Sequence, residues 1–426
     1  MAQAFRGPDR SPRRNLAVVR DRAQFRAQTQ QASAEASLPP ERSAAWLRGE
    51  PDLGYCEVMP SDSRKPPSKI ANGKYDIDKK LGAGCFGEVW RGHDSQSKQL
   101  VAVKFEDYQA QSSQLEHEVE ILRLMKKGAA VQPQGFAECF YWGREGRHHC
   151  MVMELLGKSL EDRVQECKGK LNVTSTVLVA EQILRRIEYL HSKGFIHRDI
   201  KPENFMFGVK DKVHVVYLID FGLSKRYFDS RHNPMRTKLS LTGTARYASI
   251  NAHKGHEQSR RDDLEAIGHM LMYFLRGVLP WSGLEARTQE EKYNRIRETK
   301  EKTPLDELCA GYPDAFKQFL YIARNLEYKE RPDYDGYRKL FADVRAKLNP
   351  KPQEYDFQWL QGKSDLDRLT PLGPWEPVRQ PDDEGKTGPR SAGPSSGSSR
   401  KVSAGASPST SRWWCPWCSS TKATKD

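Results

Sequence analysis

The run HRDIKPEN, which ends at Asn204, and the DFG triplet that begins at Asp220 constrain this chain more than any other feature. An aspartate at the place of Asp199 can accept the proton of a substrate hydroxyl, and a lysine at the place of Lys201 can steady the charge of a phosphoryl group in transfer. Carboxylate and amide oxygens, completed by phosphate oxygens, are the ligands that Mg²⁺ prefers. The two motifs therefore predict Asp199 and Lys201 as catalytic residues, with Asn204 and Asp220 as metal ligands.

A glycine-rich run, GAGCFGEV, lies upstream and begins at Gly82. Gly82, Gly84 and Gly87 carry no Cβ, so the backbone amides of a hairpin can close over phosphates. By itself such a run is an ordinary turn between two strands. It gains weight here because the other phosphate-handling motifs follow it in the same chain.

The segment VAVK, which ends at Lys104, reads as part of the next strand. There an ammonium group can reach the α- and β-phosphates of a nucleotide, although a lysine in a strand is more often a solvated edge residue. Such a lysine needs an acidic partner to hold it in place. The next predicted helix offers Glu116, Glu118 and Glu120, and we choose Glu118 as the partner.

Apolar patterning separates a strand-rich part of the chain from a helical part. Strands are predicted at residues 75–81, 88–92, 99–105, 150–155 and 215–219. Helices are predicted at residues 115–125, from 174 onward, and at 264–274, 315–326 and 337–348. We expect an α+β fold of two lobes: a small β-rich N-lobe with one main helix, up to about residue 156, and a larger helical C-lobe, with a cleft between them.

The two ends of the chain differ in composition from this middle. Charged residues make up 29% of the chain and hydrophobic residues 37%, which is too polar for a chain that folds throughout. Residues 1–70 are predicted to be a disordered basic arm, and residues 71–360 the folded domain. Residues 361–426, rich in Gly, Ser and Pro, are predicted to be a flexible tail.

Net charge and cysteine usage narrow the predicted binding partners and the predicted cellular compartment. A net charge of +13 suits nucleic acid, an anionic membrane or acidic protein segments. No RNA-binding motif with interleaved aromatic residues is present in the sequence, so nucleic acid is not the predicted partner. The cysteines form no disulfide framework and the N-terminus has no apolar signal region, which favours the cytoplasm or the nucleus.

In their order and separations, the motifs resemble those of protein kinases, and more narrowly those of the casein kinase 1 family, over about residues 75–360. The segment MVMELLG, from Met151, is similar to that family's hinge. The most specific stretch is LTGTARYASIN, which ends at Asn251: its last three residues stand where most protein kinases have Ala-Pro-Glu. The ion pair that other kinases form between that glutamate and an arginine is therefore absent here.

The resemblance implies a Ser/Thr protein kinase that uses ATP and Mg²⁺, with the bilobal protein-kinase fold. Met153 would be the gatekeeper of the nucleotide site, and Glu154 and Leu156 would offer backbone groups to adenine. Besides Gly82, Gly84, Gly87 and Lys104, the residues implied to bind the nucleotide are Leu81, Val89, Ala102, Met153, Glu154, Leu156, Met206 and Ile219.

The resemblance also implies substrates with acidic or phosphorylated segments. Arg246, Gly283 and Lys292 match the family's anion site, and Arg198 with Lys225 matches a second basic cluster. Cationic side chains beside a phosphate form charge-assisted hydrogen bonds. One departure weakens the second cluster, since Leu239 stands where the family has a lysine and Lys238 lies one position away. The family is usually active without phosphorylation of its activation loop.

Rival interpretations remain open at this point. A pseudokinase would keep the fold without the chemistry, but such proteins usually lack one of the residues corresponding to Lys104, Asp199, Asn204 and Asp220. The tubulin and vaccinia-related kinases form a neighbouring branch, against which the intact glycine run and the Ser-Ile-Asn stretch argue. A nucleic-acid-binding protein would account for the net charge alone.

The chain ends with a cluster of tryptophans and cysteines, WWCPWC, that resembles nothing before it. Cys415 and Cys418 are predicted to be S-acylated, which would attach the protein peripherally to a membrane. The same spacing also suits half of a zinc site completed by a partner, and the aromatic residues would also suit a protein-binding tip.

Overall fold

The computed structural model describes residues 66–84, 87–109, 113–129, 132–363, 366–374 and 378–383. Nearly all of the predicted N-terminal arm, and both Cys415 and Cys418, lie outside the described residues. The described residues belong to one compact unit that ends at Asp383.

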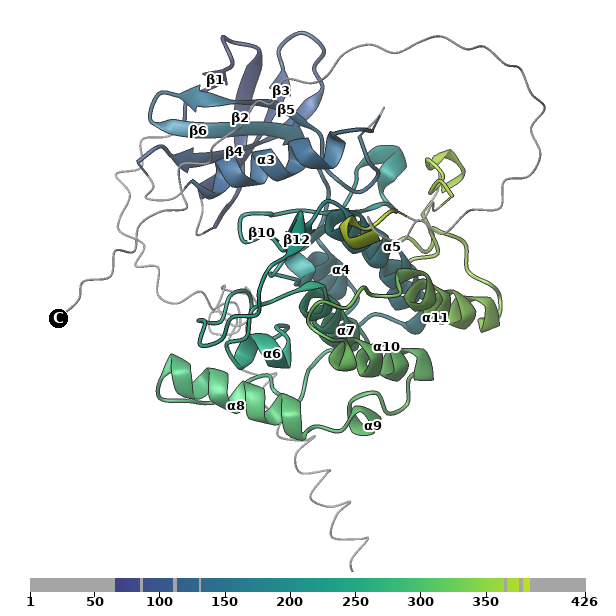
Figure 1. Cartoon of the computed structure of the whole chain (residues 1–426). Helices are drawn as coiled ribbons and strands as arrows, with labels where there is room; N and C mark the ends of the chain where they lie inside the picture. Colours follow the sequence, from purple (N-terminus) through teal and green to yellow (C-terminus); the bar gives the residue numbers. More distant parts are fainter. Residues whose placement is uncertain are drawn as a thin grey trace, which may run out of the picture. The chain divides into compact units, whose positions relative to one another are not determined.

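The N-lobe is a six-stranded antiparallel sheet in the order β1-β2-β3-β4-β6-β5 (Figure 1). Its strands are β1 (Lys69–Ile70), β2 (Tyr75–Gly84), β3 (Gly87–Asp94), β4 (Leu100–Asp107), β5 (Cys139–Glu145) and β6 (His148–Glu154). Alternate β-branched and aromatic residues of β4 and β6, such as Val103, Phe105 and Val152, form a small separate core. Ile70 of β1 is part of it, so the folded domain includes a residue before the predicted boundary at residue 71.

One helix, α3 (Gln114–Lys126), packs beneath this sheet. The Ser113 side chain caps it by accepting a hydrogen bond from the backbone nitrogen of Glu116. Glu106, at the end of β4, accepts hydrogen bonds from the backbone nitrogens of Gln114 and Leu115, which satisfies further amides of the first turn. The cap therefore ties the start of α3 directly to β4.

The C-lobe is built around two buried helices, α5 (Val173–Ser192) and α7 (Arg260–Arg276). Around them lie α4 (Leu160–Glu166), α6 (Ile250–His253), α8 (Gln289–Lys302), α9 (Leu305–Leu308), α10 (Asp314–Asn325) and α11 (Tyr334–Lys347). One continuous hydrophobic cluster joins all of these helices except α6 to the inner face of α3. The predicted α+β, two-lobed architecture is confirmed.

Short paired strands shape the loops of the C-lobe. They are β7 (Phe195–Ile196) with β10 (Lys225–Arg226), β8 (Phe205–Phe207) with β9 (Val216–Leu218), and β11 (Phe228–Asp229) with β12 (Arg231–His232). Single 3₁₀ turns occupy Pro202–Asn204, Lys210–Lys212, Leu366–Arg368 and Pro381–Asp383. The run HRDIKPEN therefore lies between β7 and β8.

Several elements had no prediction, and their residues explain why. β5 is an edge strand whose residues are only partly buried, so it shows no clear alternation. In α8 only Ile296 and Lys300 are buried, so the helix has almost no apolar stripe to detect.

The predicted start of a flexible tail at residue 361 needs correction. Asp382 lies 2.7 Å from the guanidinium of Arg260, whose side chain is 1% exposed. The Gln380 side chain is buried and donates a hydrogen bond to the carbonyl of Glu188 on α5. The buried charge of Arg260 requires a carboxylate, and Asp382 supplies it. The folded domain therefore extends past residue 360, and composition alone placed its end too early.

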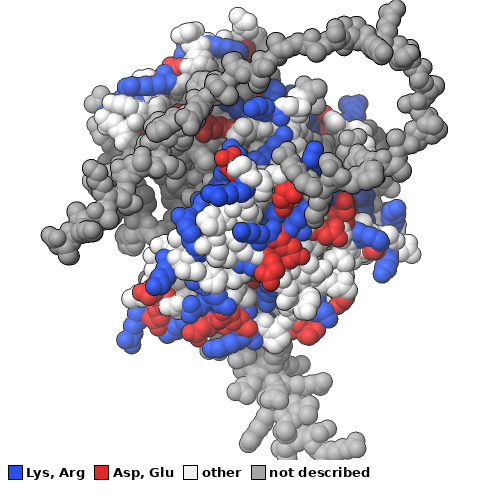
Figure 2. Space-filling view, viewed as in Figure 1, with Lys and Arg blue, Asp and Glu red and all other residues white. Residues whose placement is uncertain are grey.

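Charges of both signs are interspersed over the face of the molecule that Figure 2 shows. Ion pairs within surface helices include Lys339 with Asp343 on α11 and Arg295 with Glu291 on α8. Within the described ranges, no helix combines the length and the apolar character needed to cross a membrane.

Candidate active site

A cleft of about 490 Å³ is lined by residues of both lobes. All of the residues predicted to bind a nucleotide line it except Gly84: Leu81, Gly82, Gly87, Val89, Ala102, Lys104, Met153, Glu154, Leu156, Met206 and Ile219. Glu118, Asn204 and Asp220 line it as well. In the sheet register, Ala102 faces Met153 and Lys104 faces Met151, so β4 and β6 together form the back wall of the cleft.

The glycine-rich run forms the turn between β2 and β3, with Gly84 paired to Gly87. Gly87 has φ +128, and a Cβ built on it would lie 1.9 Å from the carbonyl oxygen of Phe105. No other residue fits there without moving the backbone of β4. The two residues at the tip of the turn lie outside the described residues.

Lys104 lies 2.6 Å from Oε2 of Glu118 and 3.8 Å from Oδ1 of Asp220. Glu118 is buried on the inner face of α3, whereas Glu116 and Glu120 are exposed. Burial alone would lower the pKa of Lys104, but the carboxylates of Glu118 and Asp220 outweigh it and raise the pKa. The ammonium is therefore charged and held between the helix and the DFG aspartate.

Asp199 is enclosed by polar partners from two segments. Its Oδ2 lies 2.7 Å from Nζ of Lys201 and accepts a hydrogen bond from the amide nitrogen of Asn204 at 3.2 Å. Its Oδ1 accepts hydrogen bonds from the backbone nitrogen and the hydroxyl of Thr244. Burial would lower the pKa of Lys201, but Asp199 outweighs this and raises it. The structure thus brings Asp199, Lys201 and Asn204 together.

Asp263 on α7 holds the loop that carries Asp199 through hydrogen bonds to its backbone. The buried carboxylate of Asp263 accepts hydrogen bonds from the backbone nitrogens of His197 at 2.7 Å and Arg198 at 2.9 Å. It also lies 2.9 Å from Nε2 of His191. Burial would raise the pKa of Asp263, but the hydrogen bond with His191 outweighs it and lowers the pKa. The sequence shows Asp263 as a charged residue within an apolar helix. That feature could have marked it as functional, but the sequence analysis gave Asp263 no role.

The comparison with known families fits this geometry. The sequence matches the model of the protein kinase domain over residues 75–337, more than half of the chain. This chain belongs to the protein kinase family. It is therefore an ATP-binding phosphotransferase with proteins as substrates.

The donor set of the kinase suits Mg²⁺. The Asn204 amide nitrogen donates to Asp199, which leaves the amide oxygen as the group that would face a cation. Burial would raise the pKa of Asp220, but Lys104 and Lys201 outweigh it and lower the pKa, so the carboxylate is ionised. One carboxylate and one amide oxygen, with phosphates and water, fit the hard-ligand preference of this ion.

Of the residues predicted to bind an anion, Arg246, Gly283 and Lys292 lie on segments that are joined to one another. Arg246 is exposed, and its carbonyl accepts a hydrogen bond of 2.7 Å from the indole nitrogen of Trp281, two residues before Gly283. Gly283 is exposed with φ +68, and a Cβ there would meet no atom within 4 Å. Lys292 lies in the first turns of α8, which packs against α6.

The second basic cluster contains an acid that the sequence prediction did not include. Glu257 is 2% exposed, forms an ion pair with Lys225 and accepts a hydrogen bond of 2.6 Å from Nε of Arg236. Burial would raise its pKa, but these two cations outweigh it and lower the pKa. Arg198 donates from Nε to the carbonyl of Leu223 at 2.8 Å. Glu257 therefore partly neutralises this cluster, and Arg236 belongs to it.

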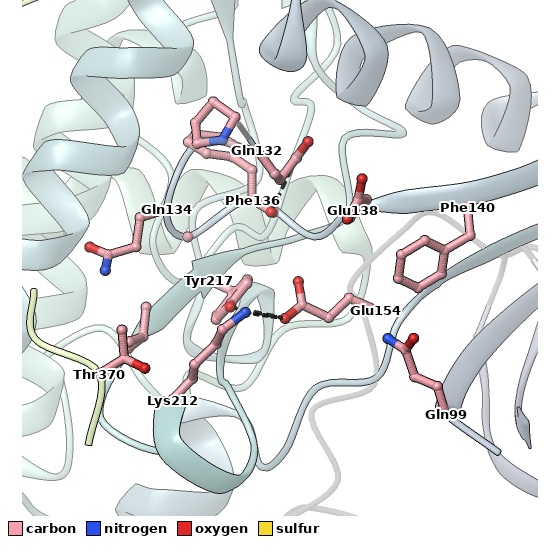
Figure 3. A pocket seen from close by; sticks show the side chains of 13 residues that line it. Gln99, Gln132, Gln134, Phe136, Glu138, Phe140, Glu154, Lys212, Tyr217 and Thr370 are labelled. Atoms are coloured by element: carbon pink, nitrogen blue, oxygen red, sulfur yellow. Dashed lines mark hydrogen bonds and ion pairs between the residues drawn. The ribbon is translucent and has the colours of Figure 1, made fainter. Parts of the chain in front are cut away.

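A separate pocket of about 400 Å³ adjoins the hinge, and Figure 3 shows its lining. Oε1 of Glu154 lies 3.0 Å from Nζ of Lys212 and accepts a hydrogen bond from the hydroxyl of Tyr217 at 3.1 Å. Glu154 thus lines both this pocket and the nucleotide cleft, and its carboxylate fixes the hinge to the loop before β9.

Proposed function

We propose that this kinase phosphorylates serine and threonine residues, with ATP and Mg²⁺, and that it favours substrates with an acidic or phosphorylated segment, as members of the casein kinase 1 family do. The observation that carries the substrate preference is an exposed arginine, Arg246, on a backbone that the C-lobe holds in place. A fixed guanidinium binds phosphate or carboxylate with geometric specificity.

In the proposed reaction, Asp199 orients the substrate hydroxyl and takes up its proton as the oxygen attacks the γ-phosphorus, while the bond to the ADP oxygen breaks. Lys201, 2.7 Å from Asp199, would lie beside the transferred group and offset its charge. Lys104, held by Glu118, would bind the α- and β-phosphates. Mg²⁺, held by Asn204 and Asp220, would supply neutralisation of the phosphate charge.

The activity is tested with Asp199→Asn. The change keeps the shape of the side chain but removes the proton acceptor, so kcat should fall by about 10²- to 10⁴-fold with nucleotide binding retained. Phosphate transfer to a serine peptide, read by mass spectrometry, measures it. A wild-type rate in the variant would refute the role of Asp199, and a wild-type protein without turnover would be a pseudokinase.

The substrate preference is tested with the double variant Arg246→Ala/Lys292→Ala. The ratio of kcat/KM for a serine peptide with an upstream phosphoserine to that for its unphosphorylated counterpart should fall by about tenfold or more. Lys302→Ala is the matched control, because Lys302 is on the same helix and its side chain is 76% exposed. An unchanged ratio in the double variant would contradict the proposed preference.

S-acylation of Cys415 and Cys418, with peripheral membrane attachment, remains a proposal from the sequence. Membrane fractionation of wild type and Cys415→Ser/Cys418→Ser tests it. An identical soluble share would contradict acylation.

A further inference from the structure

Four consecutive carbonyls, those of residues 245–248, each accept a hydrogen bond from a side chain of the C-lobe. Nζ of Lys300 donates to the first at 2.8 Å and to the fourth at 2.6 Å. Nε1 of Trp281 donates to the second at 2.7 Å, and Nδ1 of His269 lies 2.9 Å from the third. Because these residues lie in a loop, the bonds replace those that a helix or a sheet would supply.

The histidine in this set has a defined tautomer. Nε2 of His269 lies 3.1 Å from the guanidinium of Arg324, which can only donate. Nε2 is therefore the acceptor, and Nδ1 carries the proton that goes to the Tyr247 carbonyl. Each of the four carbonyls therefore accepts a hydrogen bond from an N–H group of a side chain.

Lys300 has an unusual position for a lysine. It lies in the last turn of α8, a largely exposed helix, yet it is 0% exposed. Its Nζ lies 5.3 Å from the centroid of the Trp281 ring. Burial lowers the pKa of Lys300, and a buried amino group is costly unless it is hydrogen-bonded; the two carbonyls on either side of Arg246 accept its hydrogen bonds.

These contacts occur where the chain lacks the Ala-Pro-Glu sequence. Ser249 instead forms a hydrogen bond with Asp262 of α7, and the backbone nitrogen of Ile250 donates to Glu265 at 3.3 Å. Glu265 in turn lies 3.1 Å from Nε of Arg324 on α10. Residues 245–250 are thus anchored by α7 and α8 together, and α8 is also the helix that carries Lys292.

We propose that Lys300 is a positioning residue for substrate recognition: it fixes the backbone on both sides of Arg246 and so directs the guanidinium toward an acidic or phosphorylated group of the substrate. The inference rests on the proposed preference for such substrates. Trp281 completes the arrangement by holding the carbonyl of Arg246 itself. Lys300 does not contact the substrate.

A purely structural role for Lys300 predicts a different outcome. If Lys300 only stabilised the C-lobe, its loss would lower the melting temperature and reduce kcat alike for every peptide. If it positions Arg246, its loss raises KM for a phosphorylated peptide and leaves the unphosphorylated peptide and ATP nearly unaffected. The comparison of two peptides separates the two roles.

The experiment uses the full chain with Lys300→Met, which keeps a long apolar side chain in the buried site and removes the donor. Steady-state kinetics with the phosphoserine peptide and its unphosphorylated counterpart should show a loss of preference of about tenfold, mainly in KM. Lys302→Met, exposed on the same helix, is the matched control. Trp281→Phe removes the indole donor together with part of the buried ring. It should cause a smaller loss in the same direction, and it serves if Lys300→Met does not fold.

Arg246→Ala distinguishes a failure of the proposed substrate preference from a failure of the proposed role of Lys300. An unchanged peptide preference in Arg246→Ala would overturn both the proposed preference and this inference. A loss of preference in Arg246→Ala, with wild-type preference in Lys300→Met and Trp281→Phe, would overturn the role of Lys300 alone. In the double variant Arg246→Ala/Lys300→Met, we expect the same preference as in Arg246→Ala, because both changes remove one effect.

Discussion

Thr244 donates two hydrogen bonds to the same carboxylate oxygen of Asp199, one from its backbone nitrogen at 2.9 Å and one from its hydroxyl at 2.8 Å. The other oxygen of Asp199 lies 2.7 Å from Lys201. The carboxylate of Asp199, the proposed catalytic base, is thus held at both of its oxygens, and Thr244 supplies the contacts at one of them. Arg246 follows two residues after Thr244, so the same short segment contacts the proposed catalytic base and carries the proposed substrate contact.

Thr244→Val tests this link. Valine keeps the shape of the side chain and the backbone donor, but it removes the hydroxyl that orients Asp199. We expect kcat to fall by about tenfold with little change in KM for ATP, because the nucleotide contacts are untouched. Steady-state kinetics with a serine peptide measures it, and a kcat equal to that of wild type would show that the backbone bond suffices.

Glu118→Ala should remove the support of Lys104. The lysine would lose its partner at 2.6 Å, and a displaced ammonium would no longer match the phosphates, so kcat/KM for ATP should fall by about 10²-fold. Glu120→Ala, an exposed residue on the same helix, should behave as wild type. Equal losses in the two variants would mean that the helix as a whole, and not the ion pair, is affected.

Asp382→Ala should destabilise the folded domain although it lies far outside the matched region. Arg260, 1% exposed, would keep its hydrogen bonds to the carbonyls of Lys329 and Glu330 but lose its carboxylate, at a cost of about 2 kcal/mol. Urea unfolding measures the difference.

Asp306→Ala, whose side chain is 85% exposed, is the control and should change little. By the same reasoning, a chain that ends at residue 360 should be less stable than one that ends at residue 383. Equal stability of the two would refute a structural role for the segment.

His253 gives the domain a predictable sensitivity to acid. Burial, and then the charge of Lys300, lowers the pKa of His253 to about 3. In the unfolded chain the same group takes up a proton near pH 6.5, a typical value for histidine. The unfolded state therefore binds more protons between these values, and stability falls as pH falls through that window.

His253→Gln should reduce this loss. Between pH 7 and pH 5, the decrease in the free energy of unfolding should be smaller than in wild type by about 2 kcal/mol. Urea unfolding at both pH values measures it, with His93→Gln, on the half-buried surface of β3, as the control. The same pH dependence in His253→Gln and wild type would show that His253 does not cause the loss of stability in acid.

The architecture was largely predictable, because long apolar periodicities mark buried helices and strands. The prediction for α5, from residue 174 onward, and that for α7 at 264–274 lie within their observed bounds or close to them. The prediction failed where burial is sparse, as in α8, and where polar residues pack, as at Gln380 and Asp382. Composition reports average polarity and does not show which polar group finds a buried partner.

The candidate site was predictable to the extent that its residues share one loop. Asp199, Lys201 and Asn204 lie within six residues of each other, so their spacing alone places them together. The resemblance to a family extended this to the lining of the nucleotide cleft. Spacing could not predict the roles of Asp263, Thr244 and Lys300. The hydrogen-bond partners of each lie far away in the sequence.

The sequence by itself determined the chemical groups of this kinase and the order of its elements, because both depend on residues close together in the chain. Only the tertiary structure decided which of three glutamates meets Lys104, and that Glu257 lies between Lys225 and Arg236. It also decided that Lys300 holds the carbonyls around Arg246. The physical reason is that a charge or a donor takes its role from the partners that burial leaves within hydrogen-bonding distance, and those partners come from packing between distant segments.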